Sequence, residues 1–255
     1  MKLQDSVVVI TGASSGIGAV TARELSKRGA ILVLAARRGD ELKALADEID
    51  PTGKRVLCVP TDVTKRTDID HMVEASIERF GRIDALVSNA GMGGGPMMTL
   101  DDATIEGVLT VNLLGPIRCA HAVVPYMRKQ GGGVIVNIGS VFGEVAGPGP
   151  YSVSKYGLKG FSEGLRRELL HDHIAVSLIE PGFIRTPMTT GMPFPMLEPT
   201  AVARVIAQMI EHPRRKIIVP WYYVLLKWLF ALVPMLADRV MGGSGGTEAT
   251  PESQK

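Results

Sequence analysis

Short apolar runs alternate with longer segments of mixed polarity along most of the chain. The first run, VVVI at residues 7–10, leads into a glycine-rich turn and then into a segment whose apolar residues have helical spacing up to Gly29. A short β-branched run bounded by turn residues predicts a buried strand, and apolar residues three and four positions apart predict a helix. The chain therefore opens with a strand, a turn and a helix.

Six further apolar runs repeat this pattern. They lie at residues 30–36, 54–60, 83–88, 132–140, 174–181 and 216–220. Strands that are buried on both faces lose the alternation of an open sheet, so these continuous runs predict a doubly wound α/β fold, with a mostly parallel seven-stranded sheet and helices on both faces. We expect residues 1–241 to form this single domain, and residues 242–255, which are polar and rich in glycine and serine, to be a disordered tail.

The composition excludes several classes of protein. With 28 basic and 26 acidic residues and a net charge of +2, the chain lacks the basic footprint of a nucleic-acid binder. Its two cysteines, Cys58 and Cys119, lie far apart with no CxxC spacing and no histidine cluster, so we expect reduced core residues and no metal site. Residues 1–12 lack the features of a secretory signal, and a cytoplasmic location is therefore expected.

The loop after the first strand is the first candidate for ligand binding, because ligands of such sheets bind beyond the carboxyl ends of the strands. It reads TGASSGIG and contains Gly12, Gly16 and Gly18. Glycines here let the backbone turn tightly and approach a pyrophosphate at the N-terminus of the next helix. A plain glycine turn is the alternative, and the spacing departs from GxGxxG, but the position between the first strand and the first helix favours phosphate binding.

Two arginines follow the second strand. An NAD-binding protein tends to hold an acidic residue there for the ribose 2′-hydroxyl, whereas this chain has Ala36, Arg37 and Arg38. The forked guanidinium group matches a phosphate, so the 2′-phosphate of NADP is the favoured ligand. A solvated pair of charges at the start of a helix is the alternative.

Small and polar residues follow the third and fourth strands. Asp62, which precedes Val63, could accept a hydrogen bond from the adenine amino group, or it could be a turn or capping residue. Asn89, Ala90 and Gly91 would let a backbone lie close to a cofactor, although a flexible loop would use the same residues.

A tyrosine and a lysine lie one helical turn apart at Tyr151 and Lys155, in PYSVSKYGLKGF. The pKa of a lone tyrosine is near 10, and a lysine on the same helix face can lower it, which would make a proton donor for a substrate oxygen. Ser140, after the fifth strand, could bond the same oxygen or could be a helix cap. Asn112 is a poor helix former in the middle of a helical region, and it could bind a water through a backbone distortion or be a packed polar residue.

Several motifs in this order resemble the classical short-chain dehydrogenase/reductase family: TGASSGIG, NAG, VNLLG, Ser140, YSVSK and PGFIRT, over about residues 7–188. The resemblance implies a Rossmann-like fold and NAD(P)(H)-dependent hydride transfer to or from a carbonyl or alcohol carbon. It implies a catalytic tetrad in which Tyr151 is the general acid/base and Ser140 orients the substrate oxygen. Lys155 would bind the nicotinamide ribose and depress the tyrosine pKa, and Asn112 would anchor a proton-relay water.

The same resemblance implies a set of cofactor contacts, with NADP(H) favoured over NAD(H). Thr186 would lie near the nicotinamide carboxamide, and Ile184 would contribute a backbone contact. The residues expected to bind the cofactor are Gly12, Ser14, Ser15, Gly16, Ile17, Gly18, Arg37, Arg38, Asp62, Val63, Asn89, Ala90, Gly91, Tyr151, Lys155, Pro181, Gly182, Ile184 and Thr186. A homodimer or homotetramer is also implied.

The end of the chain departs from a common soluble pattern. Residues 221–237, WYYVLLKWLFALVPMLA, carry one charge, Lys227, and we expect an apolar C-terminal helix over 221–241. This run is too short to cross a bilayer. It would pack across the substrate cleft or on a dimer partner, or it would make a peripheral membrane contact. The residues suited to a membrane contact are Trp221, Tyr222, Tyr223 and Trp228, with Arg214, Arg215 and Lys216 for anionic headgroups.

The substrate pocket is expected to be apolar. Its candidate lining residues are Met92, Met97, Met98, Phe142, Phe183, Met188, Met192 and Phe194. We therefore expect a lipophilic ketone or aldehyde, or the matching secondary alcohol, as substrate. One alternative is a catalytically idle NADP(H)-binding regulatory module. Another is an epimerase or dehydratase of a longer branch, for which the chain has no added substrate domain.

Overall fold

Seven parallel strands form one sheet in the computed structural model, which describes residues 1–191 and 195–242. The strands are β1 (Val7–Thr11), β2 (Ile31–Ala36), β3 (Val56–Pro60), β4 (Ala85–Ser88), β5 (Gly133–Ile138), β6 (Ile174–Pro181) and β7 (Lys216–Val219). Their order is β3-β2-β1-β4-β5-β6-β7, and every neighbouring pair is parallel. The predicted doubly wound, Rossmann-like α/β fold is confirmed.

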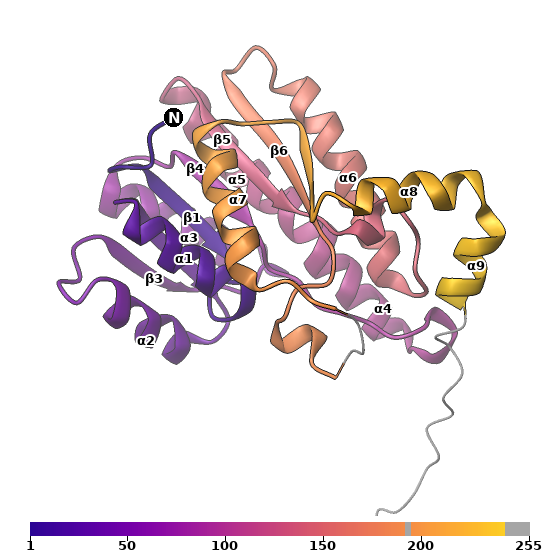
Figure 1. Cartoon of the computed structure of the whole chain (residues 1–255). Coiled ribbons are helices and arrows are strands. Elements are labelled where there is room, and N and C mark those ends of the chain that lie inside the picture. The colour runs from indigo at the N-terminus through magenta and orange to yellow at the C-terminus, as the bar shows by residue number, and fades with distance from the viewer. Residues whose placement is uncertain (192–194, 243–255) are drawn as a thin grey trace, which may run out of the picture.

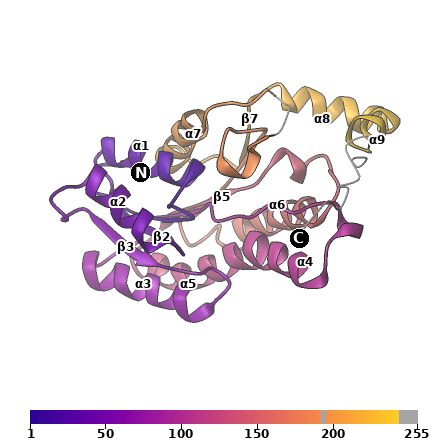
Figure 2. The same cartoon turned by 90° about the horizontal axis from the view of Figure 1, so that it is seen from below.

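Helices cover both faces of the sheet. They are α1 (Gly16–Lys27), α2 (Gly39–Ile49), α3 (Arg66–Phe80), α4 (Asp102–Leu109), α5 (Gly115–Lys129), α6 (Pro150–Glu168), α7 (Pro199–Glu211), α8 (Tyr223–Leu232) and α9 (Pro234–Gly242). Helices α1, α2 and α7 lie on one face, and α3, α5 and α6 lie on the other (Figures 1 and 2). The strand order reverses between β1 and β4, which is the point where such sheets open a crevice for a ligand.

The core has two parts, one on each side of the sheet. In β1, Val8 and Ile10 belong to the part under α1, α2 and α7, whereas Val7 and Val9 belong to the part under α3 and α5. All four side chains are essentially inaccessible to solvent, and each contributes about 1.5–3 kcal/mol of burial free energy. Because both faces of β1 are buried, its sequence is a continuous apolar run.

One long helical segment contains a local distortion. Helices α4 and α5 are joined by a π-helical turn, η2 (Thr110–Leu114), which holds Asn112 fully buried. The whole segment, Asp102–Lys129, is long and apolar enough to cross a membrane, but half of its most apolar window is buried inside the fold. It contacts α3 and α6, so it is a core helix here.

The C-terminal segment is two helices, so the prediction of a single helix over 221–241 is wrong. Pro234 has no backbone N–H to continue α8, and Val233 before it leaves the helical conformation (φ −129°, ψ 75°). We call residues 221–242 the C-terminal arm; it lies at the end of the molecule opposite α2 and α3 (Figures 1 and 2). Gly242 closes α9, and the rest of the predicted disordered tail, residues 243–255, lies outside the described residues.

Candidate active site

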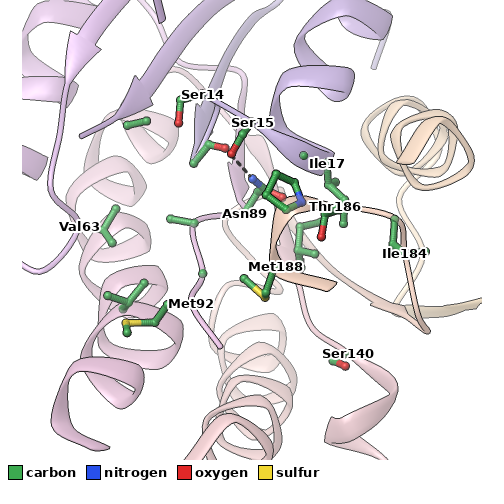
Figure 3. Close-up of a pocket in the computed structure, with 18 of the residues that line it drawn as sticks. Ser14, Ser15, Ile17, Val63, Asn89, Met92, Ser140, Ile184, Thr186 and Met188 are labelled. Atoms are coloured by element: carbon green, nitrogen blue, oxygen red, sulfur yellow. Dashed lines mark hydrogen bonds between the residues drawn. The ribbon is translucent and has the colours of Figure 1, made fainter. Parts of the chain in front are cut away.

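A cavity of about 330 Å³ lies beyond the carboxyl ends of the strands, at the point where the strand order reverses. The loops after β1, β2, β3, β4, β5 and β6 line it, together with the first turns of α6. Figure 3 shows Ser14, Ser15 and Ile17 on one side, Val63 and Met92 on another, and Ser140 at the far end. Residues that are far apart in the sequence therefore meet in one site.

The loop after β1 depends on glycine. Gly12 and Gly16 have φ values of +67° and +56°, in the left-handed region that other residues rarely adopt. A Cβ atom on Gly12 would lie 2.7 Å from the Cα of Ala90, and one on Gly18 would lie 2.2 Å from the carbonyl oxygen of Gly12. Glycine thus brings the β1 loop, the β4 loop and α1 into direct backbone contact.

The N-terminus of α1 is open to an anion. Ser15 is its N-cap residue, but no side chain caps the helix, and the first turn contains no acidic residue. The unpaired N–H groups of a helix N-terminus and the helix dipole favour a negative charge. Arg38 lies beside this turn, where its Nη2 donates to the hydroxyl oxygens of Ser14 and Ser15, each at 2.9 Å.

The loops after β2 and β3 add charged groups to the same end of the cavity. Arg37 and Arg38, which sequence analysis proposed for a phosphate site, both line it and both are exposed. Asp62 lines it too, and its Oδ1 accepts hydrogen bonds from the backbone N–H and the hydroxyl of Thr64. Burial raises the pKa of Asp62, but these hydrogen bonds and the charge of Arg37 outweigh it and leave the pKa below its usual value. Asp62 is therefore an ionised hydrogen-bond acceptor at neutral pH.

Thr11, which sequence analysis did not single out, joins the β1 and β4 loops. Its Oγ1 accepts hydrogen bonds from the backbone N–H groups of Asn89 (3.0 Å) and Ala90 (3.2 Å). In return, the Asn89 side chain donates to the carbonyl oxygens of Thr11 (3.0 Å) and Gly12 (3.1 Å). The first two residues of NAG are thus held by a network that no local sequence pattern displays.

Asn112 does not line the cavity but supports it from behind. Its Oδ1 accepts from the N–H of Met92 at 2.8 Å, and its Nδ2 donates to the carbonyl oxygen of Met92 at 2.9 Å and to the hydroxyl of Ser154 at 3.1 Å. The Ser154 hydroxyl donates in turn to the carbonyl oxygen of Tyr151 at 2.6 Å. The expected backbone distortion is present as the π-helical turn, and the side chain of Asn112 fixes the β4 loop relative to α6.

Tyr151, Lys155 and Ser140 all line the inner end of the cavity. The phenol of Tyr151 is hydrogen-bonded to Ser140. Lys155 is buried, its Nζ lies 5.4 Å from the centroid of the Tyr151 ring, and it donates to the carbonyl oxygen of Ile138 at 2.9 Å. The three groups that resemblance placed together are therefore close in space.

The pKa of Tyr151 differs from the prediction that Lys155 lowers it. Burial raises the pKa of Tyr151, and the hydrogen bond with Ser140 only partly opposes it, so the lowering of this pKa by the lysine is absent here. Burial also lowers the pKa of Lys155 to about 8. At neutral pH the tyrosine is a neutral proton donor and the lysine carries its charge.

The comparisons with known proteins identify the family. Residues 6–193 match the model of the short chain dehydrogenase family. The chain is a member of this family. YxnA of Bacillus subtilis, an uncharacterized oxidoreductase, is 36% identical over 260 residues, which cover 94% of this chain and 72% of that protein.

Two solved structures of similar proteins contain nicotinamide cofactors. A 3-ketoacyl-(acyl-carrier-protein) reductase from Brucella melitensis, complexed with NADH, has a TM-score of 0.80 and 28% identity, over 85% of this chain and 97% of that chain. An actinorhodin polyketide ketoreductase with NADPH has a TM-score of 0.79 and 30% identity, over 86% and 97%. The chain is thus an oxidoreductase of a family that uses nicotinamide cofactors.

The residues present fit such a cofactor. The uncapped N-terminus of α1, the glycine contacts beside it and the ionised Asp62 offer an anion site and a polar site at one end of the cavity. Of the residues expected to bind the cofactor, Gly18 alone does not line the cavity, because it packs beneath Gly12. Lining residues that sequence analysis did not propose are Ala36, Thr61, Val111, Ile138, Gly139, Pro187 and Thr189.

The apolar residues predicted for the substrate pocket are only partly brought together. Met92 and Met188 line the cavity. Phe142 makes edge-to-face contacts with Tyr151 (6.1 Å between centroids) and with Phe183 (5.9 Å). Met98 is 90% exposed and, like Met97, does not line the described cavity; Met192 and Phe194 lie outside the described residues.

A buried cluster of charges lies behind the site and was missed by sequence analysis. The side chains of Glu144 and Glu180 are each 1% exposed. Glu144 forms ion pairs with Lys159 (2.7 Å), Lys216 and Lys227, and Glu180 Oε2 lies 3.5 Å from the Nζ of Lys216. The available signal was Glu180 itself, the one acidic residue in a mostly apolar strand, directly before its last residue, Pro181.

The two carboxyl groups have opposite pKa shifts. Burial raises the pKa of Glu144, but the three ammonium groups outweigh it and lower the pKa to about 2. For Glu180, burial and the negative charge of Glu144 raise the pKa to about 7. Glu144 is therefore ionised at neutral pH, whereas Glu180 is about half protonated.

The raised pKa of Glu180 predicts a pH-dependent stability. Between pH 4.5 and 7 the unfolded chain ionises this group while the folded chain keeps its proton, so its contribution to stability is complete below pH 4.5 and is lost as the pH rises to about 7. The stabilising contribution of Glu144 changes little in this window, because its pKa, about 2 in the folded chain and near 4.5 in the unfolded chain, lies at or below the lower end of the window in both states. In urea titrations, the free energy of unfolding of the native chain should fall relative to Glu180→Gln by on the order of 2 kcal/mol from pH 4.5 to 8. Glu163→Gln, at an exposed surface pair, is the control. Parallel profiles for the native chain and Glu180→Gln would contradict the assignment.

Proposed function

We propose that the chain is an NADP(H)-dependent oxidoreductase that transfers a hydride between the nicotinamide and a lipophilic ketone or aldehyde, or the matching secondary alcohol. The observation that carries this proposal is one cavity with two chemically different ends. One end has the open N-terminus of α1 with Arg37 and Arg38, and the other has Tyr151 and Ser140 above the buried Lys155.

The preference for NADP(H) rests on the end of β2. Two guanidinium groups line the cavity there, and the last residue of the strand is Ala36 rather than an acid. Arginine can bind a phosphate through two parallel charge-assisted hydrogen bonds, each about twice as strong as a neutral one. Arg38 is already held by Ser14 and Ser15 beside the α1 N-terminus, where a phosphate would complete its hydrogen bonding.

The catalytic end is suited to carbonyl reduction. When bound, the nicotinamide supplies or accepts the hydride. The Tyr151 phenol, which burial keeps protonated at neutral pH, donates a proton to the substrate oxygen, and the Ser140 hydroxyl orients the same oxygen. Lys155, a buried cation behind the ring, would bind the nicotinamide ribose. Hydrogen bonds through Asn112 and Ser154 fix the position of α6 relative to the β4 loop.

A lipophilic substrate is supported by the side chains around this end. Met92 and Met188 line the cavity. The ring of Phe142 packs on that of Tyr151, and the ring of Phe183 packs on that of Phe142. Apolar walls with a few convergent polar groups are typical of small-molecule sites. Ser140 and Tyr151 are the polar groups that would select a carbonyl oxygen.

A panel of carbonyl compounds, assayed with NADPH and NADH, tests this function. The native chain should consume NADPH with lipophilic ketones or aldehydes faster than NADH. In the Arg37→Ala/Arg38→Ala variant, the Kd for NADPH should rise roughly 10- to 100-fold, because charge-assisted hydrogen bonds of about 1.5–3 kcal/mol are lost. The Kd for NADH should change by less than about threefold, since no 2′-phosphate contact is lost.

Arg167→Ala, an exposed arginine on α6 away from the cavity, is the matched control and should leave both affinities unchanged. An equal loss for NADPH and NADH in the double variant would mean that the arginines shape the loop and do not read the 2′-phosphate. Tight binding of NADPH without turnover of any compound in the panel would contradict the enzymatic function and favour a catalytically idle NADP(H)-binding module.

A further inference from the structure

Helix α8 has its polarity inverted relative to an ordinary surface helix. Its one charged residue, Lys227, points inward, where the ammonium group pairs with the buried carboxylate of Glu144. The opposite side exposes large apolar side chains, among them Leu225 (60% exposed), Trp228 and Leu232 (80%). A surface helix normally turns its charges to water and its apolar stripe to the core.

The exposed apolar side chains continue beyond α8 on both sides. Trp221 is 71% exposed and Met235 is 83% exposed. The further exposed members of this surface are Tyr222, Val224, Leu229, Val233 and Val240. We call this set the outer face of the arm. Large apolar side chains exposed together on one segment of a folded chain mark an interaction site.

The sequence that follows the arm is polar. Residues 243–255 read GSGGTEATPESQK and contain no large apolar side chain. The inner face of the arm is fixed to the domain, because the ring of Tyr223 packs on Gly182, where a Cβ atom would lie 2.3 Å from the ring, and its phenol is bonded to the backbone of Phe183. Phe230, also on the inner side, is buried. Within residues 1–191 and 195–242, the arm is therefore docked on one side and exposed on the other.

The chemistry of the outer face matches a lipid surface better than a second protein. Between residues 221 and 237 its only outward side-chain hydrogen-bonding groups are those of Trp221, Tyr222 and Trp228. Protein interfaces have a polar rim and about one hydrogen bond per 100–200 Å². Tryptophan and tyrosine, with an apolar ring and one polar group, concentrate where a bilayer meets water.

The basic residues that sequence analysis assigned to anionic headgroups take no part in this surface, and the one exposed arginine of the arm is Arg239, beside Val240 on α9. The ammonium group of Lys216, expected to meet anionic headgroups, is turned inward to Glu144 and Glu180. Arg214 and Arg215 precede β7, whereas Trp221 follows its other end. The outer face is therefore expected to bind zwitterionic and anionic lipids alike, with little dependence on salt.

The arm also borders the cavity. Gly182, against which Tyr223 packs, lines the cavity. The Cε methyl carbon of Met241 would lie 3.4 Å from a Cβ atom on Gly147, in the loop between Ser140 and Tyr151. The ten residues of α8 span only about 15 Å, half the thickness of a hydrocarbon core, so the helix cannot cross a bilayer.

We propose that the outer face of the arm inserts into the interfacial region of a bilayer, with α8 in the membrane plane, and that the cavity receives its carbonyl substrate from the lipid. The proposed membrane binding depends only on the structure of the arm. The proposed delivery of substrate from the lipid depends also on the proposed function.

The two tryptophans of the chain, Trp221 and Trp228, both lie on the outer face, so their fluorescence reports on it directly. The full chain, without cofactor or substrate, is mixed with phosphatidylcholine vesicles. The emission should shift to the blue, and the protein should float with the vesicles. Leu225→Ser/Leu232→Ser should lower the partition coefficient roughly tenfold or more, because two exposed leucines no longer enter the lipid. Leu170→Ser, at a leucine 63% exposed outside the arm, is the matched control and should float like the native chain.

Unchanged emission and a protein that stays in the soluble fraction would overturn the docking. So would a vesicle-free dimer, seen by sedimentation, that Leu225→Ser/Leu232→Ser dissociates, because a second copy would then cover the face. Circular dichroism verifies that the variants fold. Because binding is measured without turnover, a failed carbonyl panel leaves this result standing.

Turnover tests the delivery of substrate from the lipid. If the chain is active, Leu225→Ser/Leu232→Ser should turn over a water-soluble carbonyl compound at the native rate but a vesicle-dissolved one much more slowly. Equal turnover of both compounds would overturn delivery from the lipid.

Discussion

Replacing Tyr151 with phenylalanine should lower turnover by about 10³-fold, since a positioned general acid contributes about 10²–10⁴-fold to a reaction rate. The change removes the one hydroxyl that can donate a proton beside Ser140 at the inner end of the cavity. The ring remains, and with it the edge-to-face contact with Phe142. Cofactor affinity should therefore stay within about twofold of the native value.

The measurement is kcat with a carbonyl compound that the native chain reduces, together with the Kd for NADPH by fluorescence titration. Tyr156→Phe is the matched control, because Tyr156 lies on the same helix, is exposed and does not line the cavity. It should retain native turnover. Full activity of Tyr151→Phe would remove the acid/base role from this residue.

Gly18→Ala should weaken cofactor binding by at least ~100-fold and lower the free energy of unfolding by about 1–3 kcal/mol, the usual cost of forcing a methyl group into a close-packed site. The new Cβ would lie 2.2 Å from the carbonyl oxygen of Gly12 and 2.6 Å from the Nδ2 of Asn89. Neither neighbour can move freely, because Asn89 is bonded to the carbonyl oxygens of Thr11 and Gly12. The β1 loop would be displaced from the N-terminus of α1.

Urea unfolding and NADPH titration measure the two effects. Gly164→Ala is the control, since nothing lies within 4 Å of a Cβ atom at this helical position, and it should stabilise the chain by about 0.5–1 kcal/mol. If Gly18→Ala bound NADPH as the native chain does, the close approach of α1 to the β1 loop would not be required for the cofactor.

The strands and most of the cavity residues could be predicted because their signals are local. A β-branched run such as residues 7–10 reflects burial on both faces of one strand, and the loops that follow parallel strands meet at one edge of the sheet whatever their sequence. Supporting residues have no such signal. Thr11 bonds a residue 78 positions away, and Asn112 bonds Ser154, 42 positions away.

The C-terminal arm illustrates the same limit. The direction in which each face of the arm points did not follow from the sequence of 221–237. It is set by Glu144, a buried acid on a distant loop that draws Lys227 inward. The pKa of Tyr151 was mistaken for a related reason, since the spacing to Lys155 was visible while the burial of both groups was not.

The π-helical turn at Thr110–Leu114 has a geometric consequence for the helix that contains it. An α-helix rotates by about 100° per residue, and a π-helical turn holds extra chain, so it resets the phase of all residues after it. Before the turn α4 packs on α6, and after it α5 packs on α3, with Cys119 and Val123 in the core. The π-helical turn thus changes the direction in which the following side chains point. One continuous helical segment can therefore pack on both α6 and α3, while the Asn112 side chain still faces Met92.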